Sequence, residues 1–218
     1  MSEEVSWEDA WRAGRTAWDA GSSSPALVDL VATGELDRLL EGASHDRPAR
    51  VLVPGAGSGY DLLTLAARDR VVTGVDLAPS AATRFAELRA TTSPATSPQY
   101  LTRDFFELAA EDDHLGAYDL IWDYTFFCAL PPGVRDAWAS SMERLLKPRG
   151  VLVTLMFPLV EGPDVDRDQG PPYPLTRAIY ERHLLSTGRR FTLEHVSDSI
   201  RSHPGREGRE RVAIWRRT

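Results

Sequence analysis

Short, wholly apolar segments alternate along the chain with longer segments whose apolar residues recur every three or four positions. The apolar segments at residues 51–53 and 151–158 are typical of strands that are buried on both faces of a parallel sheet. The longer segments, such as residues 24–40 and 78–90, have the spacing of helices that cover such a sheet. The pattern therefore predicts an α/β fold with a mostly parallel sheet.

The prediction contains seven strands, which turn residues separate from the helices. The expected strands are residues 51–53, 71–76, 99–103, 116–122, 151–158, 191–196 and 209–215. The expected helices are residues 24–40 with a break near Gly34, 61–69, 78–90, 105–112, 135–146 and 175–185. The last two strands are expected to form a terminal antiparallel pair at the sheet edge. Because no internal repeat or second core is visible, residues 1–218 are predicted to form a single domain.

Three glycines at alternating positions, Gly55, Gly57 and Gly59, follow the first predicted strand. Glycine suits a tight turn from strand to helix, and its lack of a side chain lets the backbone approach a ligand. The second strand ends in Asp76, whose carboxylate can accept hydrogen bonds from both hydroxyls of a ribose. The dinucleotide pattern requires a glycine where this chain has Tyr60. The turn therefore suits a nucleoside without phosphates, and S-adenosylmethionine fits that description.

The third and fourth strands carry further candidate residues at their carboxyl ends, the edge where ligands bind in open α/β sheets. Asp104 follows the third strand, and its carboxylate either bonds the adenine amino group or caps the next helix. Asp123 and Tyr124 follow the fourth strand, and an aromatic run that includes Phe127 comes next. This run is either core or the wall of a methyl-acceptor pocket. Cys128 is flanked by aromatic residues without a nearby base in sequence, so it is not expected to be a nucleophile.

Three tryptophans lie in an acidic leader, residues 1–25. At 100° per residue, Trp7, Trp11 and Trp18 fall within about 40° of one another on a helix. Two interpretations are open. The tryptophans either pack the leader onto the domain, or they close over a ligand with indole rings against an aromatic or cationic group. Because Gly14 interrupts the segment, we expect one helix followed by an ordered arm.

A second candidate binding segment is the loop at residues 159–174, which is rich in proline, glycine and aspartate. It is longer than the usual connection between elements, which favours a lid or acceptor-binding loop over a simple linker. Tyr173 is the side chain of this loop that we expect to face a ligand.

Composition and charge narrow the classes of partner. The chain has 218 residues, of which 42% are hydrophobic, and a net charge of −7. This suits a globular core and does not favour binding to nucleic acid or to an anionic membrane. Cys128 is the single cysteine, so an internal disulfide and a cysteine-cluster metal site are excluded, and no metal site is expected. Because no signal sequence or membrane-spanning segment is visible, we expect a location in the cytoplasm. We also expect the protein to be a monomer.

The sequence resembles the thiopurine methyltransferase superfamily, and within it the halide/thiol methyltransferase branch. The similar segments keep their order over nearly the whole chain and include LVPGAGSGYD, VTGVDLAP, DLIWDYTFFCALPP, LLKPRGVLVTLMFPL and GREGRERVAIW. The resemblance implies a Rossmann-like class I methyltransferase sandwich, with a mostly parallel seven-stranded sheet, an antiparallel terminal strand and an N-terminal helical arm. Thiopurine-acting members tend to have arginine at the position of Tyr124, which argues against a thiopurine preference here.

The resemblance also implies which residues hold S-adenosylmethionine and its methyl acceptor. The leader tryptophans would line the cofactor site, Asp76 would bind the ribose, and Asp104 with Phe105 would bind the adenine. The cofactor-binding residues expected are Trp7, Trp11, Trp18, Gly55, Gly57, Asp76, Leu77, Asp104, Phe105 and Asp123. The substrate-binding residues expected are Tyr124, Phe127 and Tyr173.

The expected reaction is direct in-line displacement at the methyl carbon, which methylates the sulfur of a small-molecule thiol. A thiol with a pKa of about 8.5 is ionised to a few per cent near neutrality, so strong base catalysis is unnecessary. We expect Tyr124 or Asp19 to assist deprotonation or to place the acceptor. The alternatives are a halide ion as acceptor, a dedicated thiol or dithiol metabolite as substrate, and a nucleoside-binding module without turnover.

Overall fold

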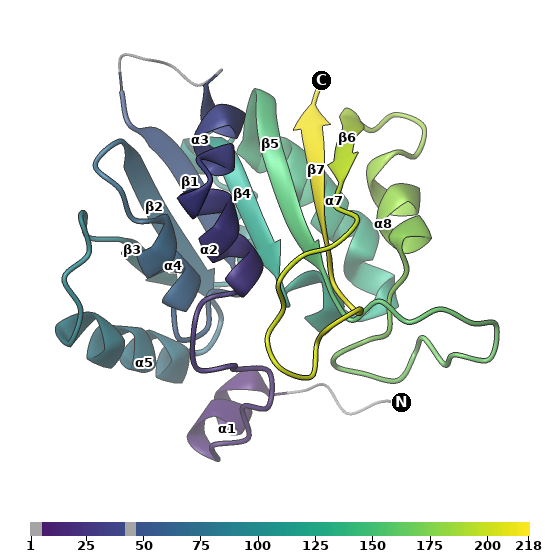
Figure 1. Ribbon diagram of the computed structural model, residues 1–218, viewed down its shortest axis with the longest axis horizontal. Helices are drawn as coiled ribbons and strands as arrows, with labels where there is room; N and C mark the ends of the chain where they lie inside the picture. The colour runs from purple at the N-terminus through teal and green to yellow at the C-terminus, as the bar shows by residue number, and fades with distance from the viewer. Residues whose placement is uncertain (1–5, 42–46) are drawn as a thin grey trace.

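The computed structural model describes residues 6–41 and 47–218, and in this part of the chain seven strands form one mixed sheet (Figure 1). The strand order is β3-β2-β1-β4-β5-β7-β6; β7 is antiparallel to both of its neighbours, and the other neighbouring pairs are parallel. The strands are β1 (Ala49–Pro54), β2 (Arg70–Asp76), β3 (Gln99–Thr102), β4 (Tyr118–Tyr124), β5 (Leu146–Met156), β6 (Phe191–Val196) and β7 (Arg211–Arg217). The α-helices are α1 (Trp7–Arg12), α2 (Pro25–Ala32), α3 (Glu35–Leu40), α4 (Tyr60–Leu65), α5 (Pro79–Ala90), α6 (Phe105–Leu108), α7 (Arg135–Leu145) and α8 (Arg177–Leu184).

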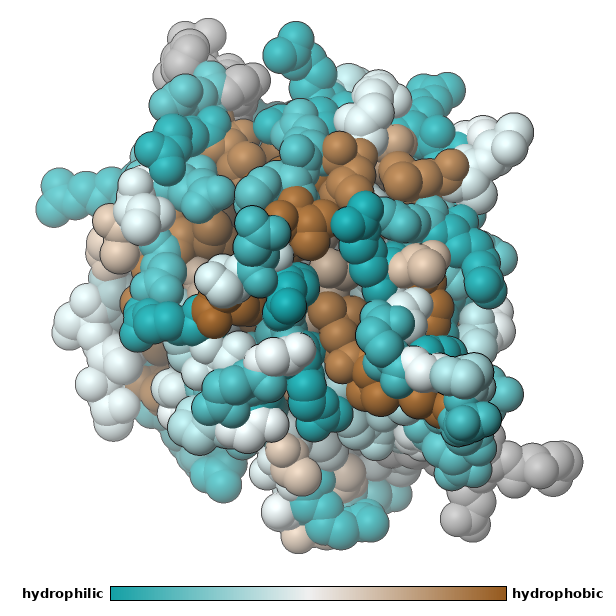
Figure 2. Space-filling view, turned by 45° about the vertical axis from the view of Figure 1, so that its right-hand side comes forward, coloured by the Kyte–Doolittle hydropathy of each residue, from teal (hydrophilic) through white to brown (hydrophobic). Residues whose placement is uncertain are grey.

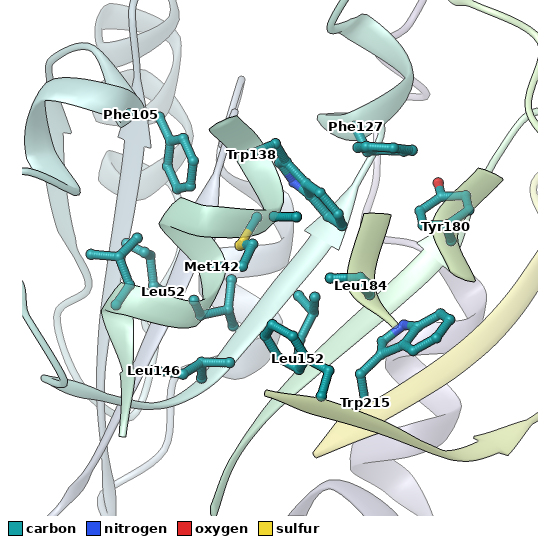
Figure 3. Close-up of a cluster of buried hydrophobic side chains, with 14 of the residues drawn as sticks. Leu52, Phe105, Phe127, Trp138, Met142, Leu146, Leu152, Tyr180, Leu184 and Trp215 are labelled. Atoms are coloured by element: carbon teal, nitrogen blue, oxygen red, sulfur yellow. The ribbon is translucent and has the colours of Figure 1, made fainter. Parts of the chain in front are cut away.

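Helices cover both faces of the sheet, and successive residues of the central strands alternate between two cores. Val51 and Val53 of β1 belong to the core that holds the apolar residues of α2, α3 and α4. Leu52 belongs to the opposite core, which α6, α7 and α8 cover. Figure 3 shows this second core, with Trp138 and Met142 of α7 lying over the strands. The alternation follows from the strand geometry and explains why β1 reads as continuously apolar.

The α/β architecture and the mostly parallel sheet are confirmed, and β6 and β7 are antiparallel partners as predicted. The pair lies at one edge of the sheet, as predicted. Within it the last strand of the chain, β7, lies between β5 and β6, so that β6 is the outermost strand. Its insertion there buries Val212 to Trp215 on both faces, which accounts for the apolar run at the end of the chain.

Two helices end earlier than the sequence predicts, and the leader helix ends near Gly14, where the sequence predicts an interruption. The helix after the glycine turn stops at Leu65, and α6 stops at Leu108. In the leader, α1 ends at Arg12, and Gly14 follows with a φ of +64°. The helical stripe of three tryptophans was therefore wrong, because Trp18 lies in the arm beyond the helix. One helix followed by an ordered arm is what the structure contains.

The surface mixes polar and apolar groups. On the face drawn in Figure 2, hydrophilic residues separate the apolar groups from one another. The large apolar side chains that are most exposed are Val28, Val71, Leu77, Leu115 and Leu185. None of the helices in the described ranges combines the length and the apolar composition that crossing a membrane requires.

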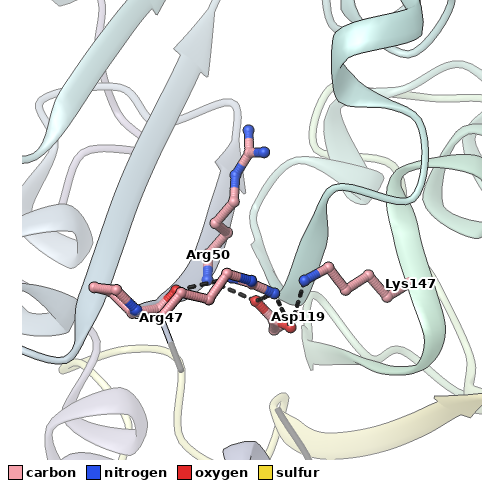
Figure 4. A network of polar contacts seen from close by, with 5 residues as sticks. Arg47, Arg50, Asp119 and Lys147 are labelled. Carbon is pink, nitrogen blue, oxygen red and sulfur yellow. Dashed lines mark hydrogen bonds and ion pairs between the residues drawn. The ribbon is translucent and has the colours of Figure 1, made fainter. Parts of the chain in front are cut away.

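One buried carboxylate joins the three central strands at the end opposite the glycine turn (Figure 4). Asp119 of β4, which is 6% exposed, accepts hydrogen bonds from Nη2 of Arg47 at 2.9 and 3.0 Å. It also accepts the backbone N–H of Arg50 on β1 at 2.7 Å and Nζ of Lys147 on β5 at 3.1 Å. Two cations and a backbone donor therefore depend on a single acceptor group.

Replacing this carboxylate should destabilise the fold. We expect Asp119→Ala to lower the free energy of unfolding by about 3 kcal/mol, because it leaves the Arg50 amide without its acceptor and two cations without their counter-ion. Urea denaturation followed by circular dichroism measures the change. The control is Glu87→Ala, which removes an exposed ion pair with Arg84 and should change stability by less than about 0.5 kcal/mol. Equal midpoints for the two variants would contradict this account.

Candidate active site

The turn after β1 brings bare backbone to the carboxyl edge of the sheet. Gly55, Gly57 and Gly59 all have positive φ, at +60°, +53° and +78°. At Gly55 a side chain is excluded for a second reason, since a Cβ there would lie 2.7 Å from Cδ2 of Phe126. The turn therefore requires glycine both for its conformation and for its close approach to the aromatic wall beside it.

The carboxylate of Asp76 holds this turn in place. It accepts hydrogen bonds from the backbone N–H groups of Gly57 and Ala78, each at 2.9 Å. Tyr100 of β3 holds the following peptide group by donating its hydroxyl to the Gly57 carbonyl at 2.7 Å. Burial raises the pKa of Asp76, while these backbone donors oppose the rise. The predicted ribose acceptor is thus rigidly oriented before any ligand arrives.

A pocket of about 700 Å³ opens over this edge and brings together most of the predicted site residues. Its volume is within the range of small-molecule sites. The predicted residues that line it are Trp7, Trp11, Trp18, Asp19, Gly55, Gly57, Asp76, Leu77, Asp104, Phe105 and Tyr124. Asp104 lines the pocket and also caps α6 by accepting the Phe106 N–H at 2.6 Å, so the capping interpretation is confirmed and the bond to adenine stays a prediction.

The leader arm closes one side of the pocket. The ring of Trp18 packs edge-on against Trp7 and Trp11, with centroids 5.2 and 5.7 Å apart. Asp19 accepts a hydrogen bond from the Ser58 hydroxyl at 2.5 Å and therefore ties the arm to the glycine turn. The tryptophans pack the leader onto Ala78 and Ala81 of the domain, and they also line the pocket, where closure over a ligand stays a prediction.

A hydrogen-bonded chain of charged and phenolic groups forms the opposite side. Tyr124 donates its hydroxyl to Oε1 of the buried Glu210 at 2.8 Å. Arg206 donates to the Tyr124 hydroxyl oxygen and, at 2.8 Å, to the Trp18 carbonyl. The Arg206 guanidinium also lies over the Phe157 ring, 4.7 Å from its centroid. Burial raises the pKa of Tyr124 above its ordinary value, so this phenol stays protonated and is a poor base.

Three predicted site residues do not line the pocket. Asp123 points away from it, because neighbouring residues of a strand face opposite sides and Tyr124 takes the pocket side. The Asp123 carboxylate instead accepts Nε1–H of Trp138 at 2.8 Å and the Phe127 N–H at 3.2 Å. Burial raises its pKa to about 6. The assignment of Asp123 to the cofactor is therefore corrected to a role within the core.

Phe127 and Tyr173 are the other two corrections. Phe127 is fully buried between Trp138 and Tyr180, with ring centroids 4.2 and 4.5 Å away. Tyr173 is 8% exposed and its ring packs against the Arg135 guanidinium, 5.6 Å from the centroid. Residues close to them in the sequence line the pocket instead. Phe126 does so in place of Phe127, and Pro171 and Pro172 do so in place of Tyr173.

Sequence reasoning missed two further groups on the pocket wall, His203 and Arg206. Both belong to the connection between β6 and β7, which carries no periodic pattern and for which the sequence analysis named no site residue. The dipeptide Pro204–Gly205 between them is a turn signal. That signal indicates a reversal of the chain, but it does not indicate which side chains the reversal brings to the sheet edge.

Comparison with known proteins agrees with this geometry. A family model described as thiopurine S-methyltransferase matches residues 2–218. The chain belongs to this family. Among curated relatives, "Probable thiol methyltransferase 2" of Arabidopsis thaliana is 40% identical over 220 residues, which cover 100% of this chain and 88% of the relative. "Thiocyanate methyltransferase 1" of Brassica oleracea is 36% identical over 215 residues, which cover 99% and 86%.

Solved structures share the fold at lower sequence identity. A 1,6-didemethyltoxoflavin-N1-methyltransferase from Burkholderia thailandensis superposes with a TM-score of 0.67 at 21% identity, covering 96% of this chain and 84% of that chain. The magnesium protoporphyrin IX methyltransferase of Synechocystis gives 0.60 at 19% identity, covering 100% and 90%. Both were solved with S-adenosylhomocysteine. By family and fold, the protein is an S-adenosylmethionine-dependent methyltransferase.

The pocket fits this cofactor in shape and chemistry. Bare backbone at Gly55 and Gly57 admits a ligand without phosphates, and Asp76 and Asp104 supply acceptors for hydroxyl and amino groups. The tryptophans of the leader offer aromatic faces to adenine or to a sulfonium cation. Within the described residues, His, Cys, Asp and Glu side chains form no group of three that could hold a metal ion.

The buried Asp123 should make stability depend on pH in a way that its amide does not. The folded-state pKa of about 6 lies above the ordinary 3.8, so folding favours the protonated carboxyl. Its favourable contribution is complete at low pH and is lost as the pH rises through about 6, a change of about 3 kcal/mol. The stability of Asp123→Asn relative to the natural chain should rise by that amount between about pH 4 and pH 7.

Urea unfolding of both proteins over this pH range measures the difference, and the amide oxygen can still accept the Trp138 hydrogen bond. A stability difference that stays constant across the range would show that Asp123 is ionised throughout, and would contradict the burial argument.

Proposed function

We propose that the protein methylates the sulfur of a small-molecule thiol, which binds as its thiolate beside Arg206. The observation that carries this proposal is the guanidinium of Arg206 on the pocket wall. It donates to the Tyr124 hydroxyl oxygen and the Trp18 carbonyl, and neither of these partners neutralises its charge. The Glu210 carboxylate lies beyond Tyr124 and does not line the pocket. A soft anion that enters the pocket would therefore be attracted by the positive charge of Arg206.

One side of the pocket suits the cofactor, and the other side suits the methyl acceptor. Asp76 and Asp104 lie on the side formed by β2 and β3, whereas Arg206 lies beside the ends of β4 and β5. The first side suits a nucleoside that carries a cationic sulfonium, and the second suits an anionic acceptor. The relatives named thiol methyltransferase and thiocyanate methyltransferase support this acceptor class.

Bound S-adenosylmethionine supplies an activated methyl group at this edge of the sheet. The chain contributes position and a dry environment. Arg206 holds the acceptor sulfur, and Phe126 and Phe157 with the loop prolines exclude water from a soft nucleophile. We assign Tyr124 to orienting Arg206, since its hydroxyl bridges that guanidinium and Glu210. We assign Asp19 to holding the arm closed through Ser58.

Thiocyanate or a halide ion is the second candidate acceptor. The same cation would hold it, and an ion without a proton needs no base. One chain supplies both sides of the pocket, so we also propose that a monomer is active. A thiopurine is the less favoured acceptor, because Tyr124 occupies the position where thiopurine-acting members tend to have arginine.

A methyl-transfer screen tests the acceptor class. Methyl-labelled S-adenosylmethionine is incubated with an aryl thiol, an alkyl thiol, hydrosulfide, thiocyanate, iodide and a thiopurine, and labelled products are quantified. We expect transfer to the thiols and to thiocyanate at rates well above the thiopurine. Binding of S-adenosylmethionine without transfer to any sulfur or halide acceptor would overturn the proposal.

Two arginines on the same ring give a matched test of the anion site. Arg206 and Arg209 both lie over Phe157, at 4.7 and 5.5 Å from its centroid, but only Arg206 lines the pocket. We expect Arg206→Gln to lower kcat/KM for thiols and thiocyanate by about 100-fold, because it removes the charge that stabilises the anion. Arg209→Gln should lower kcat/KM for thiols and for thiocyanate by less than about threefold. Equal effects of the two substitutions would place the anion elsewhere.

A further inference from the structure

His203 is a buried imidazole on the pocket wall, in the connection between β6 and β7. It is 6% exposed, and its Nε2 atom has no hydrogen-bond partner among the described residues. An unpaired polar atom inside a protein is unfavourable, so an imidazole that lines a ligand pocket and has such an atom is suited to pair with a group that the ligand brings.

The local backbone brings this imidazole and the anion-binding guanidinium to one place. The N–H of Arg206 donates to the His203 carbonyl at 3.0 Å, which closes a tight turn. Gly205 within that turn has a φ of +82°. The turn thereby puts a neutral proton acceptor and a permanent cation on the same stretch of pocket wall.

We propose that His203 takes the proton of the acceptor thiol, so that thiols require both His203 and Arg206, whereas anionic acceptors require Arg206 alone. This inference rests on the proposed thiol methyltransferase function. In the step, the S–H bond breaks, its electron pair stays on sulfur as the thiolate, and the proton forms an N–H bond with the imidazole. Arg206 then stabilises the thiolate, and the imidazolium later releases its proton to solvent.

Other groups on the wall are less suited to this step. The Tyr124 hydroxyl is already a donor to Glu210, and Asp19 accepts from Ser58. Burial raises the pKa of Cys128 to about 12, so it stays protonated near neutrality. An imidazole is the side chain whose ordinary pKa lies closest below that of a thiol.

The surroundings of His203 are consistent with a base that is neutral in the ligand-free pocket and becomes charged when a thiolate lies beside it. Burial lowers the pKa of His203, and the positive charge of Arg206 lowers it further, so the ring is neutral at pH 7. The carboxylates of Glu210 and Asp61 act in the opposite direction and stabilise the imidazolium once it forms. Asp61 is fixed on α4 by hydrogen bonds from Ser23 and from Nε1 of Trp122 at 2.5 and 2.8 Å.

The first test separates acceptors that carry a proton from one that does not. We expect His203→Gln to lower kcat/KM for an alkyl thiol by about 100-fold or more near pH 7, and to change thiocyanate methylation by less than about threefold. The thiol defect should shrink as the pH rises past the pKa of the thiol, about 8.5, because the thiolate then forms without help. His195→Gln on the exposed edge strand is the control, and it should affect neither acceptor.

Two results of this test would overturn the proposal: an equal loss with thiol and thiocyanate, which would make His203 a positioning residue, or no loss with the thiol. Failure of the underlying function looks different, because the unsubstituted protein would then methylate neither acceptor.

A second test follows the proton without turnover. Calorimetric titration of an alkyl thiol into the protein with S-adenosylhomocysteine, in buffers of different ionisation enthalpy, counts the protons released on binding. We expect release near zero for the natural chain, because His203 keeps the proton, and about one for His203→Gln, which cannot keep it. Equal release from the two proteins would overturn the proposal.

Histidine NMR of the natural chain gives the same readout if the substituted protein does not fold. One of the five histidines should become protonated when the thiol binds. If all five keep their protonation state, the proposal fails.

Discussion

The turn from Gly55 to Asp61 is the constraint on which the rest of the structure depends. Its glycines need positive φ and carry no side chains, so at these positions only backbone groups can hold the turn in place. The hydrogen bonds to it come from four separate parts of the chain. Asp76 and Tyr100 bind the Gly57 peptide from β2 and β3, Asp19 of the arm binds Ser58, and Trp122 of β4 binds Asp61. The glycines give this loop wide conformational freedom, and hydrogen bonds from the sheet and the leader together restrict it to one conformation.

Much of the fold follows from period and composition, because the central strands are covered on both faces. Residues such as Val51 and Leu52 must both be apolar although they face opposite cores, and such continuous runs are visible in the sequence. The periodic pattern does not indicate where each helix ends. Gly14 ends α1 before the tryptophan spacing is complete, and Trp18 reaches the other indoles from the arm instead. Tertiary contact, not helical period, brings the three rings together.

The cofactor side of the site was predictable and the acceptor side was not, for a physical reason. The glycines, Asp76 and Asp104 lie where parallel strands end, so topology alone places them at one edge. At the end of β4, either Asp123 or Tyr124 can face the pocket, and which of them does so depends on which face of the sheet each residue of the strand occupies. Leu120 and Trp122 share one core, and Tyr124 packs against that core too, which leaves Asp123 on the other side. The loop that carries His203 and Arg206 has no period, so only the folded chain shows where they lie.

The Arg206 guanidinium makes the two sides of the site interdependent. Its bond to the Trp18 carbonyl fixes the same arm whose indole rings line the pocket, while its bond to Tyr124 holds it beside the region where we propose that the acceptor binds. An arm displaced from the pocket would remove a carbonyl acceptor from this cation and open the cofactor side to water at once. The position of the leader therefore bears on acceptor binding as well as on cofactor binding. The leader is short, and its one helix has about a turn and a half. It affects both sides of the site because it is hydrogen-bonded to Ser58 on one side and to Arg206 on the other.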